Sequence, residues 1–142
     1  MSPSKTRLVN GNVEVFDPVR RKFVLLTPEE KVRQGVINYL LNIALYPKSS
    51  IAVEKKLVIN GLLKRFDVLV YNSSFIPALL VECKNPGIIM NEALCRQAAI
   101  YNLSLKVPFL WLTNGECHFF IKNDLAAESY AYLDKLPDFS LL

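Results

Sequence analysis

Apolar and polar residues alternate over several short stretches of the chain, which is the pattern of half-buried β-strands. Residues 13–26 contain two such stretches around Asp17-Pro18, a turn-forming pair, and predict an N-terminal hairpin. Asn60-Gly61 is a two-residue hairpin signal between two further alternating stretches. Together with the remaining turn signals, the pattern predicts strands at 51–60, 62–71, 76–84, 107–113 and 116–122.

Two other stretches carry apolar residues at helical spacing. The first opens with Thr27 as N-cap and Pro28 at the first helical position, and Glu30 stands where a capping box would close. This helix is expected to end near Tyr46, before a proline. The second helix is expected over 91–105.

The predicted order after the hairpin is α-β-β-β-α-β-β. A strand, a helix and another strand form a crossover that returns parallel, so the sheet should be mixed, with helices covering it. The expected fold class is α/β (α+β), with an αβββαβ core whose mixed central sheet is flanked by helices. We expect one domain, 1–142, made of an N-terminal extension (1–26), a core (27–123) and a C-terminal cap (124–142) that is either a short helix or irregular.

Composition limits the class of protein. The chain has 142 residues, 51% of them hydrophobic and 21% charged, which is enough apolar material for one stable core. No apolar run approaches the roughly 20 residues that span a bilayer, and the N-terminus lacks the apolar segment of a secretory signal, so a cytoplasmic location is expected. The formal charge of +4 permits nucleic-acid binding without requiring it.

The three cysteines predict reduced, buried thiols. Cys83, Cys95 and Cys117 form no C-x-x-C pair, and their number is odd. A zinc site that includes His118 is disfavoured, because adjacent residues of a strand point to opposite faces.

Charged residues inside two apolar strands are the most informative feature. In R-F-D-V-L-V-Y, alternation places Phe66 and Val68 on one face and Asp67 on the other; in L-L-V-E-C-K it places Glu82 and Lys84 together. Unpaired carboxylates are costly to bury. A divalent cation bound by Asp67 and Glu82 would neutralise them, and Lys84 beside it could hold or help deprotonate an attacking water. The pattern predicts a hydrolytic phosphodiesterase centre.

A structural interpretation of these residues stays open, in which Asp67 forms a salt bridge with Lys84 or Arg65. The second helix favours the functional one. Gln97 falls on the same stripe as Leu94 and Tyr101, so it is expected to face the sheet, where a buried amide needs partners. The alternative for these two residues is a glutamine that caps a strand end and a tyrosine in the core.

Most of the chain resembles the N-terminal nuclease domain of type I restriction enzyme R subunits, within the PD-(D/E)XK superfamily. The resembling segments are FDPVRRKFVLLTPEEKVRQ, IAVEKKL, KRFDVLVY, LLVECKNP, RQAAIYN and FLWLTNGE. The resemblance implies a Mg²⁺- or Mn²⁺-dependent nuclease whose substrate is nucleic acid, with DNA expected. Its implied site comprises the metal ligands Asp67, Glu82 and the backbone carbonyl of Cys83, the catalytic Lys84, and the Q-x-x-x-Y residues Gln97 and Tyr101.

The chain departs from the family pattern in two ways. Phe66 replaces the proline before the aspartate, which changes no ligand. There is also no G-x-x-x-x-G-K-[ST] phosphate loop, helicase motor or methyltransferase motif, so a standalone relative is expected rather than a complete restriction subunit.

Secondary candidates surround this site. Glu30 and Glu54 are further metal-ligand candidates, although a capping box and a charged edge strand explain them equally well. Arg33, Gln34 and Arg96 are candidate phosphate contacts together with Tyr101, although solvated helix faces are the commoner explanation.

Two other functions remain open from the sequence: a non-catalytic module that binds nucleic acid or recruits a partner, and a structural subunit that associates through the N-terminal hairpin. The oligomeric state also stays open: the chain could form a homodimer or be part of a larger restriction-type complex. Strandedness, sequence specificity and the choice between DNA and RNA are not determined.

Overall fold

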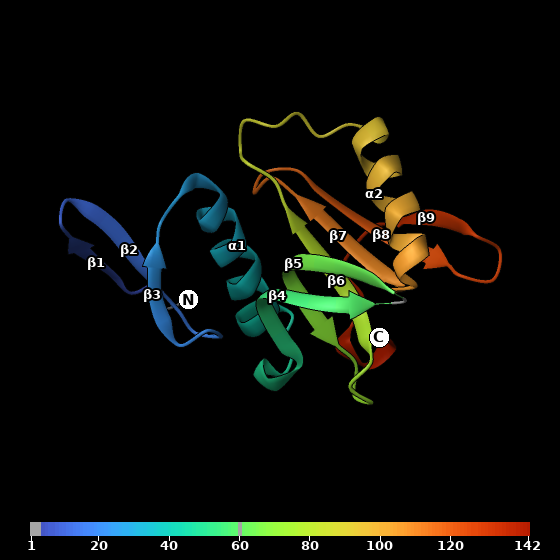
Figure 1. Cartoon of the computed structure of the whole chain (residues 1–142), viewed down its shortest axis with the longest axis horizontal. Helices are drawn as coiled ribbons and strands as arrows, with labels where there is room; N and C mark the ends of the chain where they lie inside the picture. The colour runs from blue at the N-terminus through green and yellow to red at the C-terminus, as the bar shows by residue number, and fades with distance from the viewer. Residues whose placement is uncertain (1–3, 60) are drawn as a thin grey trace.

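The computed structural model describes residues 4–59 and 61–142. A mixed six-stranded sheet forms its centre, and a separate three-stranded antiparallel sheet lies beside α1 at the N-terminal end (Figure 1). This confirms the expected mixed α+β architecture. The strands are β1 (Thr6–Val9), β2 (Asn12–Asp17), β3 (Lys22–Leu25), β4 (Ile51–Ile59), β5 (Leu62–Tyr71), β6 (Pro77–Cys83), β7 (Phe109–Thr113), β8 (His118–Asp124) and β9 (Ser129–Leu133).

The helices are two α-helices and three short pieces. They are α1 (Pro28–Asn38), the π-helix η1 (Tyr39–Ile43), the 3₁₀ turn η2 (Lys48–Ser50), α2 (Glu92–Leu105) and the 3₁₀ turn η3 (Phe139–Leu141). Among the helices in the described residues, none is both long and apolar enough to cross a membrane.

The central sheet has the order β4-β5-β6-β7-β8-β9. Its one parallel pair is β6–β7, with Val81 opposite Trp111, and α2 makes the crossover between them, as expected. The two α-helices cover opposite faces. On one face Val36 and Leu40 pack against Val68 and its neighbours, and on the other Cys95 and Ala99 of α2 pack in a second core cluster.

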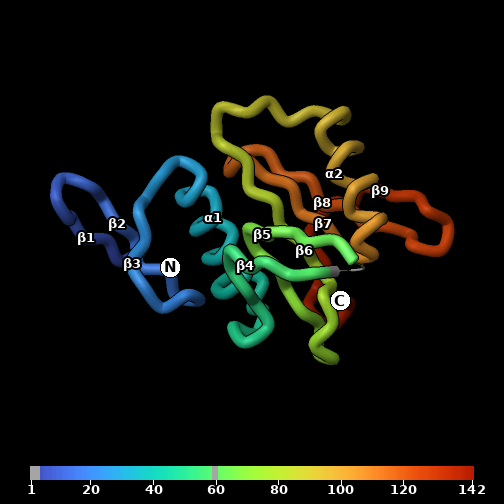
Figure 2. The backbone as a smooth tube through the Cα atoms, viewed as in Figure 1, coloured from blue at the N-terminus to red at the C-terminus, as the bar shows by residue number. Residues whose placement is uncertain are grey.

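The N-terminal extension has three strands, so the predicted two-stranded hairpin was incomplete. β1 pairs with β2 through a turn at Asn10-Gly11, whose φ angles of 50° and 80° are those of a tight hairpin turn. All four residues of β1 are exposed, so the strand lacks the apolar alternation that would reveal it. Figure 2 shows this sheet projecting beyond α1, away from the central sheet.

The C-terminal cap is also more regular than expected. Ser129–Leu133 forms β9, which pairs antiparallel with β8 through Asn123 opposite Tyr130. A sixth strand therefore extends the sheet where a short helix or an irregular segment was predicted.

The start of α1 agrees with the sequence in part. The Thr27 side chain accepts a hydrogen bond from the Glu30 backbone N–H at 3.1 Å, and Pro28 is the first helical residue. The capping box does not close, because the Glu30 carboxylate binds Arg20 and Arg33 instead of the Thr27 backbone. Glu30 is thus part of a buried ionic cluster.

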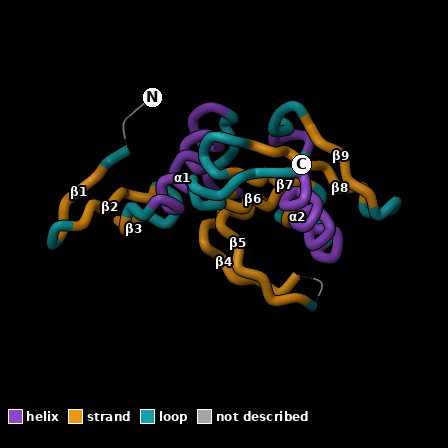
Figure 3. Tube along the Cα trace, turned by 90° about the horizontal axis from the view of Figure 1, so that it is seen from above, coloured by secondary structure: helices purple, strands orange, loops and turns teal. Residues whose placement is uncertain are grey.

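Strands β4 and β5 bend sharply at Glu54 and Asp67. Glu54 has a φ of 51°, in the left-handed region, and the ladder is regular on both sides of it, with Val53 opposite Val68 and Lys55 opposite Phe66. Beyond this point the two strands leave the central sheet together as a two-stranded ribbon. Figure 3 shows this ribbon extending out of the body. We call residues 55–66 the distal hairpin; residue 60 within it lies outside the described chain.

The bend corrects one prediction of side-chain direction. Phe66 and Val68 were expected on the same face, but Phe66 packs in the core cluster under α2, whereas Val68 packs in the cluster under α1. The physical reason is that a residue in the left-handed conformation interrupts the pleat, so the faces exchange across Glu54 and Asp67.

Candidate active site

Asp67 lies where β5 and β6 separate. The antiparallel ladder between these strands runs as far as Val68 opposite Val81, which confirms that the strands carrying Asp67 and Glu82 are adjacent and antiparallel. One residue further, Oδ2 of Asp67 accepts a hydrogen bond of 2.8 Å from the backbone N–H of Cys83. Where the backbone hydrogen bonds between β5 and β6 end, a side-chain hydrogen bond thus continues the pairing. This bond holds the Asp67 carboxylate against the strand that carries Glu82.

The second oxygen of Asp67 binds α1. Nη2 of Arg33 donates to Oδ1 of Asp67 at 2.9 Å, and the same guanidinium binds Glu30 and lies 3.1 Å from Oε1 of Glu54. Burial by itself would lower the pKa of Arg33, but the hydrogen bond and charge of Asp67 and the charge of Glu54 raise it above its ordinary value. Arg33 therefore stays charged and holds four carboxylates together, the fourth being Glu29 at 3.4 Å.

This arrangement corrects the expected phosphate contacts at Arg33 and Gln34. The Arg33 side chain is 7% exposed and surrounded by carboxylates, so it does not reach a phosphate at the surface. Gln34 is buried as well, and its amide donates to Asp17 at 3.0 Å and to Glu30 at 3.2 Å. Helical spacing could not distinguish these residues from a solvated face, because their partners come from distant segments.

The ionic cluster continues to the N-terminal sheet. Arg20, in the turn after β2, binds Asp17 at 2.7 Å and also binds Glu30, and its Nη1 lies 3.6 Å from Oε2 of Glu54. Burial would raise the pKa of Asp17, but hydrogen bonds from Arg20 and Gln34 lower it overall. The pKa of Glu54 is likewise lowered: the hydrogen bond from Arg65 and the nearby arginine charges outweigh its burial.

Glu82 and Lys84 line a cleft of about 310 Å³ on the α2 face of the sheet. Nζ of Lys84 lies 3.7 Å from Oε2 of Glu82, and Nζ of Lys64 lies 3.8 Å from its Oε1. Gln97 and Tyr101 of α2 line the same cleft, as the sequence predicted. The cleft therefore combines one carboxylate, two ammonium groups, an amide and a phenol.

The predicted stripe on α2 is displaced by about one position. The buried residues of this helix include Cys95, Ala99 and Asn102, whereas Gln97 is exposed and Tyr101 is 41% exposed. Gln97 is therefore not the buried amide that we expected, and Tyr101 is not a core residue. The small side chains of Cys95 and Ala99 let the helix lie close to the sheet. Gln97 and Tyr101, on the adjoining face of the helix, border the cleft.

Lys64 is the residue of this cleft that the sequence did not suggest. Its Nζ lies 4.3 Å from the centroid of the Tyr101 ring, within cation–π range, as well as near Glu82. Its neighbour on the same strand face is Phe66, which is buried under α2. That spacing is the one local signal that could have placed Lys64 in the cleft.

Arg96 lies outside the residues that line the cleft. It is exposed on α2, with Nη2 3.6 Å from Oε1 of Glu92 one turn earlier. Its expected contact with a phosphate stays a prediction.

The donor set suits a hard divalent cation in kind. Asp67 and Glu82 provide carboxylate oxygens on neighbouring strands, and Mg²⁺ is commonly held by one or two carboxylates with water and phosphate completing its shell. Within the described residues, no three His, Cys, Asp or Glu side chains gather as ligands of one ion. The residues fit an ion that substrate and water complete, rather than one enclosed by protein ligands.

The cysteines do not form a metal site. Cys83 and Cys95 are buried in the core clusters on opposite faces of the sheet, and Cys117 is half-buried. Burial raises the pKa of the Cys83 thiol, and the nearby Asp67 charge adds to this effect. The expectation of reduced thiols fits these positions, apart from the partial exposure of Cys117.

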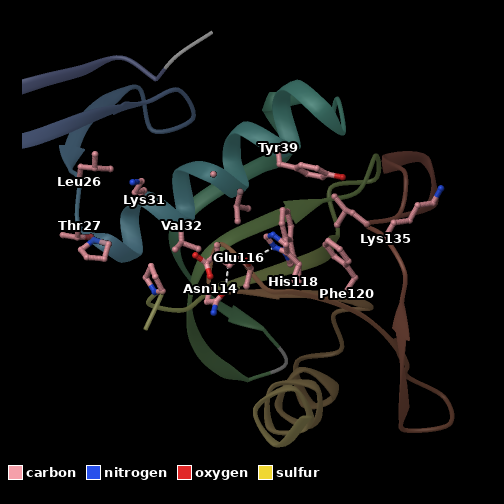
Figure 4. A pocket seen from close by; sticks show the side chains of 18 of the residues that line it. Leu26, Thr27, Lys31, Val32, Tyr39, Asn114, Glu116, His118, Phe120 and Lys135 are labelled. Carbon is pink, nitrogen blue, oxygen red and sulfur yellow. Dashed lines mark hydrogen bonds between the residues drawn. The ribbon is translucent and has the colours of Figure 1, made fainter. Parts of the chain in front are cut away.

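A larger cavity of about 1100 Å³ lies between α1 and strands β7 and β8, on the other face of the sheet from Glu82 (Figure 4). His118 lines it, and its Nδ1 accepts a hydrogen bond from Nε1–H of Trp111 at 3.3 Å and lies 2.8 Å from Oγ1 of Thr113. Burial lowers the pKa of His118. The histidine belongs to an aromatic cluster with Trp111 and Phe120 and lies apart from the candidate catalytic residues.

Comparison with known proteins gives a family. The model of the type I restriction enzyme R protein N terminus (HSDR_N) matches residues 28–137, from the first residue of α1 to the segment after β9. The matched range includes each strand and helix that contributes to the cleft and to Asp67. The search of curated proteins finds no match. Because the family model covers well over half of the chain, the protein belongs to the family of type I restriction enzyme R protein N-terminal domains.

Proposed function

We propose that this domain is a metal-dependent nuclease of the PD-(D/E)XK type that hydrolyses phosphodiester bonds of DNA. The observation that carries the proposal is that Glu82 and Lys84 face one cleft, while Asp67 is hydrogen-bonded to the backbone N–H of Cys83, the residue between them. Gln97 and Tyr101 line the same cleft. The family supports a nuclease-related role for the domain.

The ion of this proposal is Mg²⁺ or Mn²⁺, held by Asp67, Glu82 and the backbone carbonyl of Cys83. A carboxylate oxygen has two lone pairs, so Asp67 can keep its bonds to Arg33 and Cys83 and still offer a free lone pair. When bound, such an ion lowers the pKa of a coordinated water and offsets negative charge on phosphate.

The side chains of the cleft supply the remaining chemistry. Lys84 and Lys64 lie on either side of Glu82 and are placed to stabilise the charge that develops on the phosphate during hydrolysis. Gln97 makes no hydrogen bond within the described residues, so its amide is available to a nucleotide or a water. Tyr101 offers an exposed ring edge and hydroxyl beside Lys64.

Arg33 serves this site as a positioning residue. It fixes Oδ1 of Asp67 while Cys83 fixes Oδ2, so the carboxylate has little freedom to rotate. Glu30 and Glu54 bind the same guanidinium, and we propose that they support Asp67 through Arg33. The domain would act in the cytoplasm within a restriction-type complex, as the family name suggests.

The test is cleavage of linear duplex DNA, single-stranded DNA and RNA by the purified domain with Mg²⁺, with Mn²⁺ and with a chelator. Glu82→Gln and Lys84→Ala should abolish cleavage while folding and DNA binding persist, because their roles lie in the transition state. Asp67→Asn should also abolish it, with some loss of stability because an amide cannot accept from both Arg33 and Cys83. Lys48→Ala, at an exposed lysine before β4, is the matched control.

The rival function is a nucleic-acid-binding module that keeps the fold without the reaction. The observation that favours this module is that Glu82 lies between two lysines and Asp67 is bound by Arg33. Each of these two carboxylates therefore has a cationic partner without any metal ion. A wild-type domain that binds DNA but cleaves no substrate with either metal would establish the module and refute the nuclease.

A further inference from the structure

We infer that the distal hairpin, joined at its base to the Glu82–Lys84 cleft, is a β-ribbon that binds in the major groove of duplex DNA. The inference deepens the proposed function by naming the form of the substrate and the surface that holds it. It relies on that function for the identity of the partner as DNA.

The first observation is that the charged residues of the hairpin, which lie at its base, are all basic. Residues 55–65 include Lys55, Lys56, Lys64 and Arg65 and no acidic residue. Lys55 and Lys56 are exposed and form no ion pair within the described chain, in contrast with the arginines of the ionic cluster. Unpaired lysines on a projecting element are suited to phosphate contacts, which give DNA binding most of its affinity.

The second observation is the difference between the two faces of the ribbon. Leu57 and Phe66 pack against the cluster under α2, and Lys64 reaches Tyr101, so this face is anchored to the body. The opposite face presents two cross-strand pairs, Lys56 with Arg65 and, nearer the tip, Val58 with Leu63. Val58 is 68% exposed and Leu63 is 71% exposed, on a ribbon that pairs with no third strand over this length.

An exposed apolar pair near the end of a ribbon with a basic base is better suited to contact with base edges than to exposure to water. A two-stranded ribbon is one of the elements that the B-form major groove admits, and aliphatic side chains there contact the methyl group of thymine. Lys56 and Arg65, on the same face, would lie near the groove walls, where the phosphates are.

The chemistry of the ribbon also distinguishes duplex DNA from other nucleic acids. Binding of single strands relies on aromatic side chains that stack on bases, and residues 55–65 contain none. The major groove of A-form RNA is too narrow for side chains to read. B-form DNA is the nucleic acid that matches the width, charge and apolar end of this element.

The position of the hairpin connects groove binding to the candidate active site. Lys64 belongs to the ribbon and also lies 3.8 Å from Glu82, so the anchored face of the ribbon adjoins the cleft. Arg65 is bound to Glu54 at 2.7 Å, which fixes the base of the ribbon to the cluster around Asp67. The hairpin and the site are therefore held as one unit.

The experiment measures equilibrium binding of a labelled duplex of about 20 base pairs, a length that covers the footprint of a small domain. A chelator is present, so cleavage does not interfere. The variant Lys56→Ala should weaken binding by about 3- to 10-fold near 0.1 M salt and reduce the salt slope by about one, because each lost phosphate contact lowers the slope by about one. The matched control is Lys48→Ala, at an exposed lysine away from the hairpin, which should bind like the wild type.

A second variant separates the tip from the charges. Val58→Ser/Leu63→Ser should weaken duplex binding without changing the salt slope, because no phosphate contact is lost. Thermal melting of each variant verifies the fold. Competition with unlabelled single-stranded DNA and with duplex RNA tests the substrate form, and duplex DNA should compete best.

Several outcomes overturn the inference: Lys56→Ala and Lys48→Ala bind equally, the salt slope is unchanged in Lys56→Ala, or single strands compete as well as duplex. Its failure is distinguishable from failure of the nuclease proposal. A domain that cleaves DNA with or without the hairpin lysines is a nuclease that does not use the ribbon. If duplex binding depends on the hairpin but no DNA is cleaved, the DNA-binding role of the ribbon is supported and the nuclease proposal is refuted.

Discussion

Nη2 of Arg33 lies 2.9 Å from Oδ1 of Asp67, and this hydrogen bond joins α1 to the bend of β5. The same guanidinium binds Glu30 and Glu54. A single buried cation therefore fixes carboxylates from α1, β4 and β5. The candidate ligand Asp67 is therefore positioned by tertiary contacts from the far face of the sheet, while Glu82 and Lys84 face the cleft.

Removing the Arg33 charge should be strongly destabilising. Arg33→Ala removes the cationic partner of Asp67 and one of the partners of Glu30 and Glu54, and breaking such a buried cluster costs about 3–5 kcal/mol in the free energy of unfolding. Arg33→Lys should lose less, because it keeps the charge but cannot bind several carboxylates at once. Denaturant unfolding measures both variants.

The control for this series is Arg96→Ala. Arg96 is exposed and lies 3.6 Å from Glu92, so its removal should change the free energy of unfolding by less than about 0.5 kcal/mol. Equal effects at Arg33 and Arg96 would refute the buried cluster.

The ring of Tyr101 should matter more than its hydroxyl. Lys64 lies 4.3 Å from the ring centroid, an interaction worth about 0.5–1 kcal/mol at an exposed site. Tyr101→Phe keeps that surface and should retain kcat/KM for DNA cleavage, whereas Tyr101→Ala should lower it by about two- to fivefold. Equal losses in the two variants would instead assign a role to the hydroxyl.

Two glycines should respond oppositely to alanine. Gly115, in the turn before β8, has a φ of 98°, and an added Cβ would lie 3.3 Å from Cγ2 of Val32, so Gly115→Ala should cost about 1 kcal/mol or more. Gly35, within α1, has open space around the same position, so Gly35→Ala should stabilise by about 0.5–1 kcal/mol. Thermal melting of the pair gives the comparison, and a common sign would contradict it.

Acid should weaken the cluster through Asp17. The pKa of this buried carboxyl is held below its ordinary value of about 3.9, so the folded state binds its proton less readily than the unfolded state does. Its contribution to stability is complete above that ordinary value and is lost as the pH falls through the lowered pKa. Unfolding at a series of pH values should show this decline.

Asp17→Asn identifies the group responsible for that decline. The variant should be less stable than the wild type at neutral pH, because the amide cannot replace the charge beside Arg20. The difference should shrink as the pH falls below about 4, where the unfolded wild type begins to bind the proton, and vanish as the pH falls through the lowered pKa of the folded state. A gap that stays constant with pH would contradict the assignment.

Local patterns determined much of this protein from its sequence. Alternation located β5 almost to the residue, and the N-cap signal at Thr27 placed the start of α1. The spacing of Glu82 and Lys84 put them on one strand face, and their shared cleft follows from it. These features depend on neighbours a few residues apart, so the chain reveals them before it folds.

Tertiary structure decided what depends on distant partners. Arg33 and Gln34 have the helical spacing of surface residues, but acidic residues from β2, β4 and β5 surround or bind them, and burial follows from those contacts. The exchange of faces at Asp67 needs the left-handed conformation of Glu54 on the paired strand. Lys64 enters the cleft because the change of face at the bend turns it toward Tyr101 of α2. Sequence periodicity assumes a regular strand and a uniform environment, and the site lies where both conditions fail.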